Sequence, residues 1–279
     1  MFWEFVLNDK GYLCKYSNKL VFYGNFNTKK NKPNVLLLLP KTRGPFGIKE
    51  FKQAIRKKFN LLEFDDVKSE KLTALSQNKV ISFEQKAAAI DKALKKFKEN
   101  KYHIIGHSTG CGLGTFLAKK NKFCESLILI NPWNKEDEEF RTLQKNRVKN
   151  AKIMNIISFL DNEYSLLYSE TYIKKFKDEF NNITLKQKNK KIDYSFIERR
   201  LQSILKCNIG NELRKLVLPK LFINSVDDKL MKPYHAKELH KLCFNSKLIT
   251  LDGGGHMLTE TRAQDLIGHI NSFVKVLGK

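Results

Sequence analysis

The segment YHIIGHSTGCGLGTF (residues 102–116) decides which fold this chain can adopt. It begins with apolar residues typical of a buried strand and continues as an apolar helix. Between the two stands a G-x-S-x-G pattern at residues 106–110, with Ser108 at its centre. A sharp strand-to-helix turn strains the backbone of the central residue, and only glycine fits two positions away on either side.

This pattern has two interpretations. One is a glycine-rich turn in which Ser108 caps the following helix. The other is a strained turn that exposes the Ser108 hydroxyl near a helix N-terminus, where free backbone N–H groups stabilise negative charge. A serine nucleophile also needs a base, and an acid to orient that base. The second interpretation therefore depends on the rest of the chain.

Strands and helices alternate on both sides of this segment. NVLLLLP (34–40) is an uninterrupted apolar run, which predicts a central parallel strand buried on both faces. Residues 2–26 predict an antiparallel hairpin. Further strands are expected at 60–67, 125–132, 219–225 and 247–252, and helices at 47–59, 83–100, 233–243 and 260–277. The series predicts the α/β class, a doubly wound and mostly parallel sheet.

The alternation stops between residues 135 and 215, where only helical patterns such as 155–180 and 194–205 occur, separated by a polar loop. We expect residues 1–134 and 216–279 to form the sheet domain, and 135–215 to form a helical cap inserted between two central strands. The apolar side chains of this insert could form the wall of an acyl pocket or pack onto the sheet: Phe159, Leu166, Leu167, Tyr168, Tyr172 and Phe176.

The best candidate for the base is His256, in the sequence GGGHM between an apolar strand and the last helix. Three glycines suggest a loop that aims one side chain. His103 lies within a strand, and His107 adjoins the serine, so its side chain should point away from the Ser108 hydroxyl. The remaining histidines lie in helical patterns and are expected to be exposed: His235, His240 and His269.

The acid candidates follow the apolar strand of LFINSVDDKLMKP, at Asp227 and Asp228. Carboxyl ends of parallel strands lie at one edge of a sheet, so either carboxylate could lie beside Ser108 and His256. Each residue alone has an ordinary explanation in a turn. These three residue types follow separate strands in the order Ser, Asp, His. This favours the interpretation of Ser108 as a nucleophile over that of a helix cap.

In these residues the chain resembles the α/β-hydrolase superfamily, through GHSTG, the helical insert, NSVDDKLMKP and GGGHM. Asp228 begins the D-x-x-apolar-x-P pattern in which that family places its acid, and this favours Asp228 over Asp227. The resemblance implies that Ser108 is the nucleophile, His256 the general base and Asp228 the residue that orients it. It also implies that the backbone N–H of Thr109 is one oxyanion donor.

The chain departs from the family at two loops. It has PKTRGPFG (40–47) where many members have His-Gly, and it lacks the usual Gly-x-Gly after the strand at 60–67. By position Thr42 would supply the second oxyanion N–H, with Lys41 as the alternative. The expected function is a serine hydrolase acting on a small-molecule carboxylic ester or acyl thioester. An acyltransferase with the same residues and a weakly active ligand-binding member remain alternatives.

The net charge of +23 raises the question of a nucleic-acid partner. Only 8 of the 52 basic residues are arginine, the residue best suited to phosphate and base recognition. Segment 135–215 carries 18 basic and 12 acidic residues, so its charge density matches the rest of the chain. We therefore attribute the charge to a general preference for lysine and expect no specific nucleic-acid partner.

The sequence contains no metal-ligand cluster and no phosphate-binding loop, so we expect no cofactor and no metal. Five cysteines without C-x-x-C spacing indicate reduced thiols in a cytoplasmic protein. No apolar run approaches the length of a transmembrane segment, and the N-terminus lacks the features of a signal peptide. No pattern specifies an oligomeric state.

Overall fold

The computed structural model describes residues 4–8, 11–15, 20–40, 46–65, 80–95 and 100–278, the first two ranges as backbone only. These residues form one sheet of nine strands in the order β1-β2-β3-β5-β4-β6-β7-β8-β9. The strands are β1 (Glu4–Asn8), β2 (Gly11–Lys15), β3 (Val21–Gly24), β4 (Asn34–Leu38), β5 (Asn60–Phe64), β6 (Tyr102–His107), β7 (Cys124–Ile130), β8 (Lys220–Ser225) and β9 (Ser246–Leu251).

The sheet is antiparallel at one end and parallel through the rest. β1, β2 and β3 pair antiparallel, and β3 joins β5 antiparallel. From β5 onward through β4, β6, β7, β8 and β9 every pairing is parallel. The expected doubly wound, mostly parallel sheet is therefore confirmed, and its carboxyl ends share one edge.

Two hydrophobic cores lie on opposite faces of the sheet. Alternate residues of β4 enter different cores, with Leu36 and Leu38 in one and Val35 and Leu37 in the other. All five residues of β4 are buried, which explains why the sequence shows a continuous apolar run rather than alternation.

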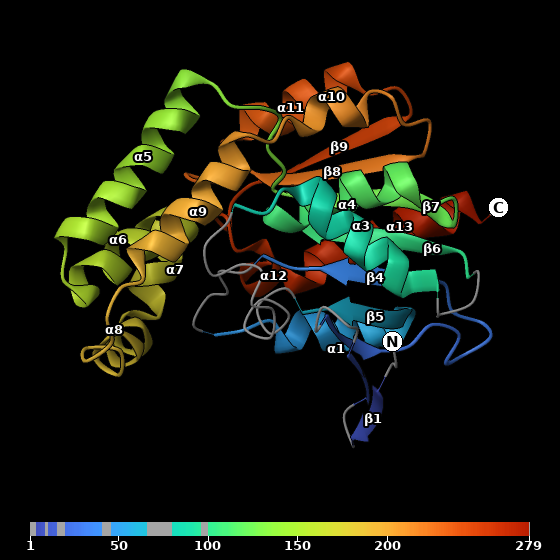
Figure 1. Ribbon diagram of the computed structural model, residues 1–279, viewed down its shortest axis with the longest axis horizontal. Coiled ribbons are helices and arrows are strands. Elements are labelled where there is room, and N and C mark those ends of the chain that lie inside the picture. Colours follow the sequence, from blue (N-terminus) through green and yellow to red (C-terminus); the bar gives the residue numbers. More distant parts are fainter. Residues whose placement is uncertain are drawn as a thin grey trace.

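Helices cover both faces (Figure 1). The first face carries α3 (Phe83–Leu94), α4 (Thr109–Lys120), α10 (Ile209–Leu213) and α11 (Pro233–Leu242). The other face carries α1 (Lys49–Lys58), α12 (Leu258–Thr261) and α13 (Ala263–Leu277). The predicted closing helix at 260–277 is thus two helices, because the chain leaves helical geometry at Arg262, where φ is −135°.

Between β7 and β8, which are neighbours in the sheet, the chain forms a group of helices that stands to one side (Figure 1). They are α5 (Glu138–Ile153), α6 (Ile156–Leu167), α7 (Glu170–Lys175), α8 (Lys177–Leu185) and α9 (Tyr194–Leu205), followed by α10. The helical stretch predicted at 155–180 consists of three helices, α6, α7 and α8. Ser169 causes the first break, because its hydroxyl accepts the N–H of Tyr172 and begins a new helix.

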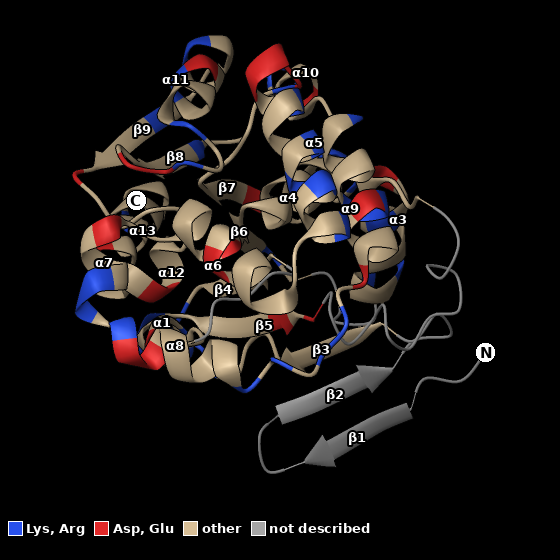
Figure 2. Cartoon of the chain, turned by 90° about the vertical axis from the view of Figure 1, so that its left-hand side faces the viewer, with Lys and Arg blue, Asp and Glu red and all other residues tan. Residues whose placement is uncertain are grey.

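Basic and acidic residues are mixed over these helices, as the even charge density of the sequence predicts. Figure 2, which views the molecule from the side of the insert, shows Lys and Arg spread over several helices with Asp and Glu among them. None of the helices that the structure describes is both long and apolar enough to cross a membrane.

Candidate active site

Ser108 occupies the turn between β6 and α4. Its φ of 53° and ψ of −118° lie in a region that residues with side chains rarely adopt. A Cβ on Gly106 would lie 2.6 Å from the carbonyl oxygen of Gly110, and one on Gly110 would lie 1.9 Å from that of Leu38. Both flanking glycines are therefore required by contact with backbone, as the G-x-S-x-G pattern predicts.

The structure brings Ser108, His256 and Asp228 together in a hydrogen-bonded row. The Ser108 Oγ lies 2.8 Å from Nε2 of His256, and Nδ1 of His256 lies 2.7 Å from Oδ2 of Asp228. All three side chains are buried. An ionised carboxylate only accepts hydrogen bonds, so Nδ1 carries the proton and Nε2 is free to accept the serine O–H. Such a row can activate a hydroxyl as a nucleophile.

The turn after β8 gives its two aspartates different contacts. Asp228 Oδ1 accepts the backbone N–H groups of Leu230 and Met231, both at 2.8 Å, which leaves Oδ2 directed at His256. Asp227 instead accepts the N–H of Gly255 at 2.8 Å. Both aspartates thus act on the His256 loop, one on the imidazole and one on the backbone. The sequence pattern alone gave Asp227 no role beyond that of the less favoured acid.

Two further buried residues bind the backbone carbonyl of His256. Nε2 of His107 and Nδ2 of Asn131 each lie 2.8 Å from this oxygen. Nδ1 of His107 accepts from the hydroxyl of Thr259 at 3.1 Å. Burial, and then the neighbouring His256, lower the pKa of His107 to about 3, so it is a neutral donor to the carbonyl. Its two ring nitrogens thus bind the His256 carbonyl and Thr259 rather than the Ser108 hydroxyl.

The sequence pattern did not mark Asn131 as a site residue, because this asparagine stands at the end of an apolar strand. It follows β7 with a φ of 48°, a conformation that asparagine tolerates better than most residues. An asparagine directly before proline, at the end of an apolar strand, is the signal that could have marked it as a turn residue.

The helical insert contacts the same loop. The carbonyl oxygen of Leu167, the last residue of α6, accepts the N–H of His256 at 2.9 Å and that of Met257 at 3.1 Å. Gly255 has a φ of +67°, and a Cβ there would lie 2.8 Å from the same carbonyl oxygen. A second link joins Tyr168, whose hydroxyl donates to Glu260 at 2.6 Å.

Aromatic rings of the insert pack on one another around Phe46. The ring of Phe46 lies 5.0 Å from that of Phe180 and 5.3 Å from that of Phe176, and Tyr168 stacks on Tyr172 at 5.4 Å. These contacts favour packing as the main role of the apolar residues that the sequence singled out. Phe46 precedes α1 in the sequence, so its ring contacts join the insert to the segment that leads into α1.

Thr109 is the first residue of α4, where a backbone N–H has no acceptor within its own helix. This N–H follows the serine, in the position that the resemblance implies for an oxyanion donor. Thr42 and its alternative Lys41 lie outside the described residues.

The other histidines range from buried to exposed, and His269, which was expected to be exposed, is half-buried. His103 is buried in β6 with Nδ1 2.9 Å from the hydroxyl of Ser126, and His240 is exposed. The expected exposure of His235 is wrong, because its side chain is 1% exposed and packs edge-on against Phe140. Helical position alone did not reveal that α5 begins beside it.

Comparison with known proteins identifies the family of the chain. A family model described as the alpha/beta hydrolase fold matches residues 68–263. The chain is 24% identical over 205 residues to the putative carbamate hydrolase RutD of Acinetobacter baylyi, covering 70% of this chain and 75% of that protein.

The solved structures that resemble most of the chain include two hydrolases. MGS-M2, an alpha/beta hydrolase enzyme from a Medee basin deep-sea metagenome library, has a TM-score of 0.79 at 14% identity, covering 98% of this chain and 97% of that one. The enol-lactonase of Burkholderia xenovorans LB400 has a TM-score of 0.74 at 16% identity, covering 92% and 96%. At these identities the likeness concerns the fold.

Proposed function

Because this chain belongs to the alpha/beta hydrolase family, we propose that it is a serine hydrolase that cleaves a carboxylic ester or acyl thioester through an acyl-enzyme on Ser108. The observation that carries the proposal is the hydrogen-bonded row of three buried side chains, at 2.8 Å and 2.7 Å, on a strained turn. In this proposal His256 is the general base and Asp228 its orienting carboxylate.

In the first step the Ser108 oxygen attacks the substrate carbonyl carbon while Nε2 of His256 takes the hydroxyl proton. Asp228 stabilises the resulting imidazolium and keeps the ring in place. The tetrahedral intermediate collapses with loss of the alcohol or thiol, which receives the proton from Nε2. In this proposal the Thr109 N–H stabilises the oxyanion; a donor of this kind contributes about 10²–10³ in rate.

In the second step water replaces the leaving group. His256 takes a proton from water, the hydroxide oxygen bonds to the acyl carbon, and the carboxylic acid departs as the proton returns to the Ser108 oxygen. Because the same residues serve both steps, a group that displaces water at this stage would convert hydrolysis into acyl transfer.

We assign the cap to residues 135–215 and propose that it covers the acyl group. Support comes from the contact of Leu167 with the His256 loop. Helix α10, the last helix of this segment, packs on α4 and α11 of the sheet domain. Two of the similar proteins are named enol-lactonase and putative carbamate hydrolase. Lactones and carbamates both contain a carbonyl group, and this supports an acyl substrate.

We also propose a cytoplasmic location. The four cysteines whose side chains the structure describes are buried free thiols: Cys111, Cys124, Cys207 and Cys243. Free thiols are typical of a reducing compartment.

The proposal is tested with a fluorophosphonate probe and a panel of p-nitrophenyl esters and acyl thioesters of graded length. We expect the probe to label one residue, Ser108, and Ser108→Ala to lose both labelling and turnover. Ser165→Ala, which removes an exposed hydroxyl on α6, is the matched control and should behave as the native protein. Equal labelling of Ser108→Ala would exclude the mechanism, and ligand binding without turnover on the whole panel would favour a non-catalytic member.

A further inference from the structure

Two loops at the amino edge of the sheet expose large apolar side chains. Val217 lies just before β8 and is 82% exposed, and Phe244 lies just before β9 and is 85% exposed. No other large apolar residue in the described part of the chain is as exposed. Because β6, β7, β8 and β9 run parallel, this edge is opposite the one that carries Ser108. The two loops are therefore separate from the proposed catalytic residues.

A buried lysine joins the two loops. Lys220 is the first residue of β8, and its side chain is fully buried. Its ammonium group donates to three backbone carbonyl oxygens: those of Leu216 at 2.5 Å, Leu218 at 2.8 Å and Phe244 at 3.2 Å. The first two of these residues flank Val217. The backbone that presents Val217 and Phe244 is thus fixed from beneath, and the two apolar side chains protrude from neighbouring loops.

Basic residues surround these apolar side chains. Lys241 and Lys247 each stand three residues from Phe244, and Arg214 stands three residues before Val217; all three are exposed. Leu242 is 47% exposed. Residues 213–225 and 239–251 together contain no Asp or Glu. We call the exposed residues of these two segments the amino-edge patch: Arg214, Val217, Lys241, Leu242, Phe244 and Lys247.

The carboxylates that flank these segments in the sequence bind other groups. Glu212 lies 2.8 Å from the ammonium group of Lys119. Glu238 accepts a hydrogen bond from Nδ2 of Asn134 at 2.8 Å. Neither carboxylate belongs to the patch, so the positive charge of the patch is not neutralised within it.

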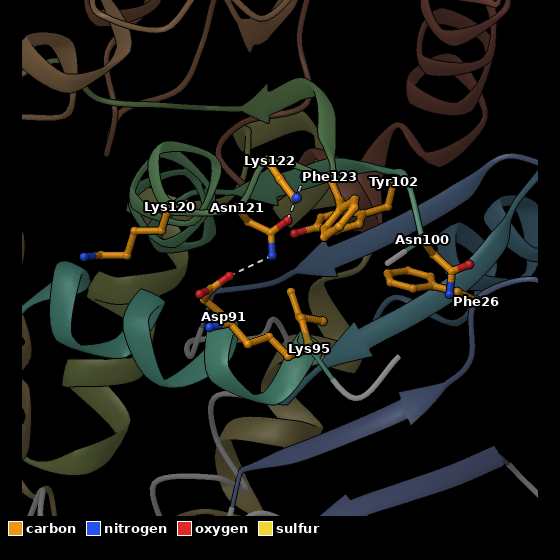
Figure 3. Close-up of a pocket in the computed structure, with 10 residues that line it drawn as sticks. Phe26, Asp91, Lys95, Asn100, Tyr102, Lys120, Asn121, Lys122 and Phe123 are labelled. Carbon is orange, nitrogen blue, oxygen red and sulfur yellow. Dashed lines mark hydrogen bonds between the residues drawn. The ribbon is translucent and has the colours of Figure 1, made fainter. Parts of the chain in front are cut away.

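The amino end of β6, two strands away, has a different surface. Figure 3 shows the pocket there, in which Asp91 stands among lysines and accepts a hydrogen bond from Asn121 at 2.7 Å. The rings of Phe26 and Tyr102 that line this pocket belong to buried residues. Protruding apolar side chains and uncompensated basic residues thus occur together at β8 and β9 rather than along the whole edge.

We propose that the amino-edge patch docks the chain on an anionic phospholipid surface. The side chains of Val217 and Phe244 enter the apolar boundary of the bilayer, while the surrounding lysines and arginine pair with anionic headgroups. A nucleic acid would match the charge but would leave the apolar side chains in water. The cytoplasmic leaflet is anionic, in agreement with the proposed location. In the docked chain the edge that carries Ser108 faces away from the bilayer.

The first experiment is co-sedimentation with vesicles of two parts phosphatidylcholine and one part phosphatidylserine, and with vesicles of phosphatidylcholine alone. We expect binding to the anionic vesicles and at least tenfold weaker binding to the neutral ones. Phe244→Ser should weaken binding about tenfold, because its ring no longer leaves water. Lys241→Gln and Lys247→Gln should each weaken it about fivefold.

Matched controls come from the insert, on the other side of the molecule. Ile153 is 67% exposed at the end of α5, and Lys186 is exposed after α8. Ile153→Ser and Lys186→Gln should bind anionic vesicles like the native protein. In a second experiment, Phe244→Trp should shift its tryptophan emission to shorter wavelength with anionic vesicles, and Ile153→Trp should not.

The proposal is overturned if the anionic vesicles do not bind, if the neutral ones bind as tightly, or if Phe244→Ser binds like the native protein. Tighter binding to duplex DNA than to anionic vesicles would overturn it in favour of a nucleic acid. A native dimer that Phe244→Ser dissociates would overturn it as well, because a second copy would then cover the patch. None of these measurements uses turnover, so they do not depend on the function of Ser108.

Discussion

The carbonyl oxygen of Leu167 accepts the N–H of His256 at 2.9 Å. Leu167 ends the second helix of the insert, and His256 stands in the loop after the last strand. Four residues thus hydrogen-bond to His256: Leu167 of the insert binds its N–H, His107 and Asn131 bind its carbonyl oxygen, and Asp228 binds its ring. The position of the insert and that of the imidazole are therefore linked.

Gly255→Ala tests this link. The new Cβ would lie 2.8 Å from the Leu167 carbonyl oxygen at a φ of +67°. We expect a loss of roughly 1–3 kcal/mol in the free energy of unfolding, and a fall in kcat of up to about 10²-fold because a displaced imidazole is misaligned. Gly268→Ala is the control: its Cβ would meet nothing within 4 Å in α13, so stability should rise by up to about 1 kcal/mol. Denaturant titration and ester turnover measure both effects.

Asp228→Asn and Asp227→Ala distinguish the two neighbouring carboxylates. The amide at residue 228 cannot hold the imidazole in the required tautomer, and kcat should fall about 10⁴-fold. Loss of the Asp227 contact with the Gly255 N–H should cost less, up to about 10²-fold, because only the loop is displaced. A larger loss at Asp227 than at Asp228 would reverse the assignment.

His107→Gln changes the pH dependence of stability. Burial and the neighbouring His256 lower the pKa of His107 to about 3 in the folded protein, against about 6.5 in an unfolded chain. Between these values the unfolded chain binds a proton that the folded protein does not, so stability falls as pH falls. The variant should lose this contribution, up to about 1.4 kcal/mol per pH unit. Urea titrations of both proteins from pH 7 to pH 4 test this prediction. It is contradicted if the unfolding free energy changes with pH equally in the variant and the native protein.

A buried ion pair joins the first two helices of the insert. Arg147 Nε lies 2.9 Å from Oε1 of Glu163, and Nη2 lies 2.5 Å from Oε2. Burial raises the pKa of Glu163, but Arg147 more than offsets this and the pKa lies below its ordinary value. Arg147→Met removes both of these hydrogen bonds from a buried carboxylate, whose charge only Arg200 then stabilises, and should cost up to about 3–5 kcal/mol of unfolding free energy.

Arg141→Met is the control for that variant. Arg141 lies on the same helix and pairs with Glu136 at the surface, so its loss should cost about 1 kcal/mol or less. Equal losses from both variants would show that the Arg147 pair gains nothing from burial. Chemical denaturation of the two proteins side by side decides the question.

Local patterns were sufficient for most of the fold. The apolar runs placed β4, β6 and β8 to within two residues, because strands buried on both faces leave a continuous apolar signal. Helix ends inside the insert were harder to predict. The break at Ser169 rests on one capping hydrogen bond, and a serine within an amphipathic pattern signals such a break only weakly.

The sequence by itself determined the strained turn at Ser108, since the glycines at 106 and 110 are required by contacts within the turn and with the adjacent strand. It also determined that Ser108, Asp228 and His256 stand at the ends of strands. Only the tertiary structure decided which oxygen of Asp228 faces His256, that Asp227 and Asn131 hold the loop, and that Leu167 links it to the insert. These contacts join segments far apart in the chain, and their geometry depends on how the strands are ordered and the helices packed, which local periodicity does not specify.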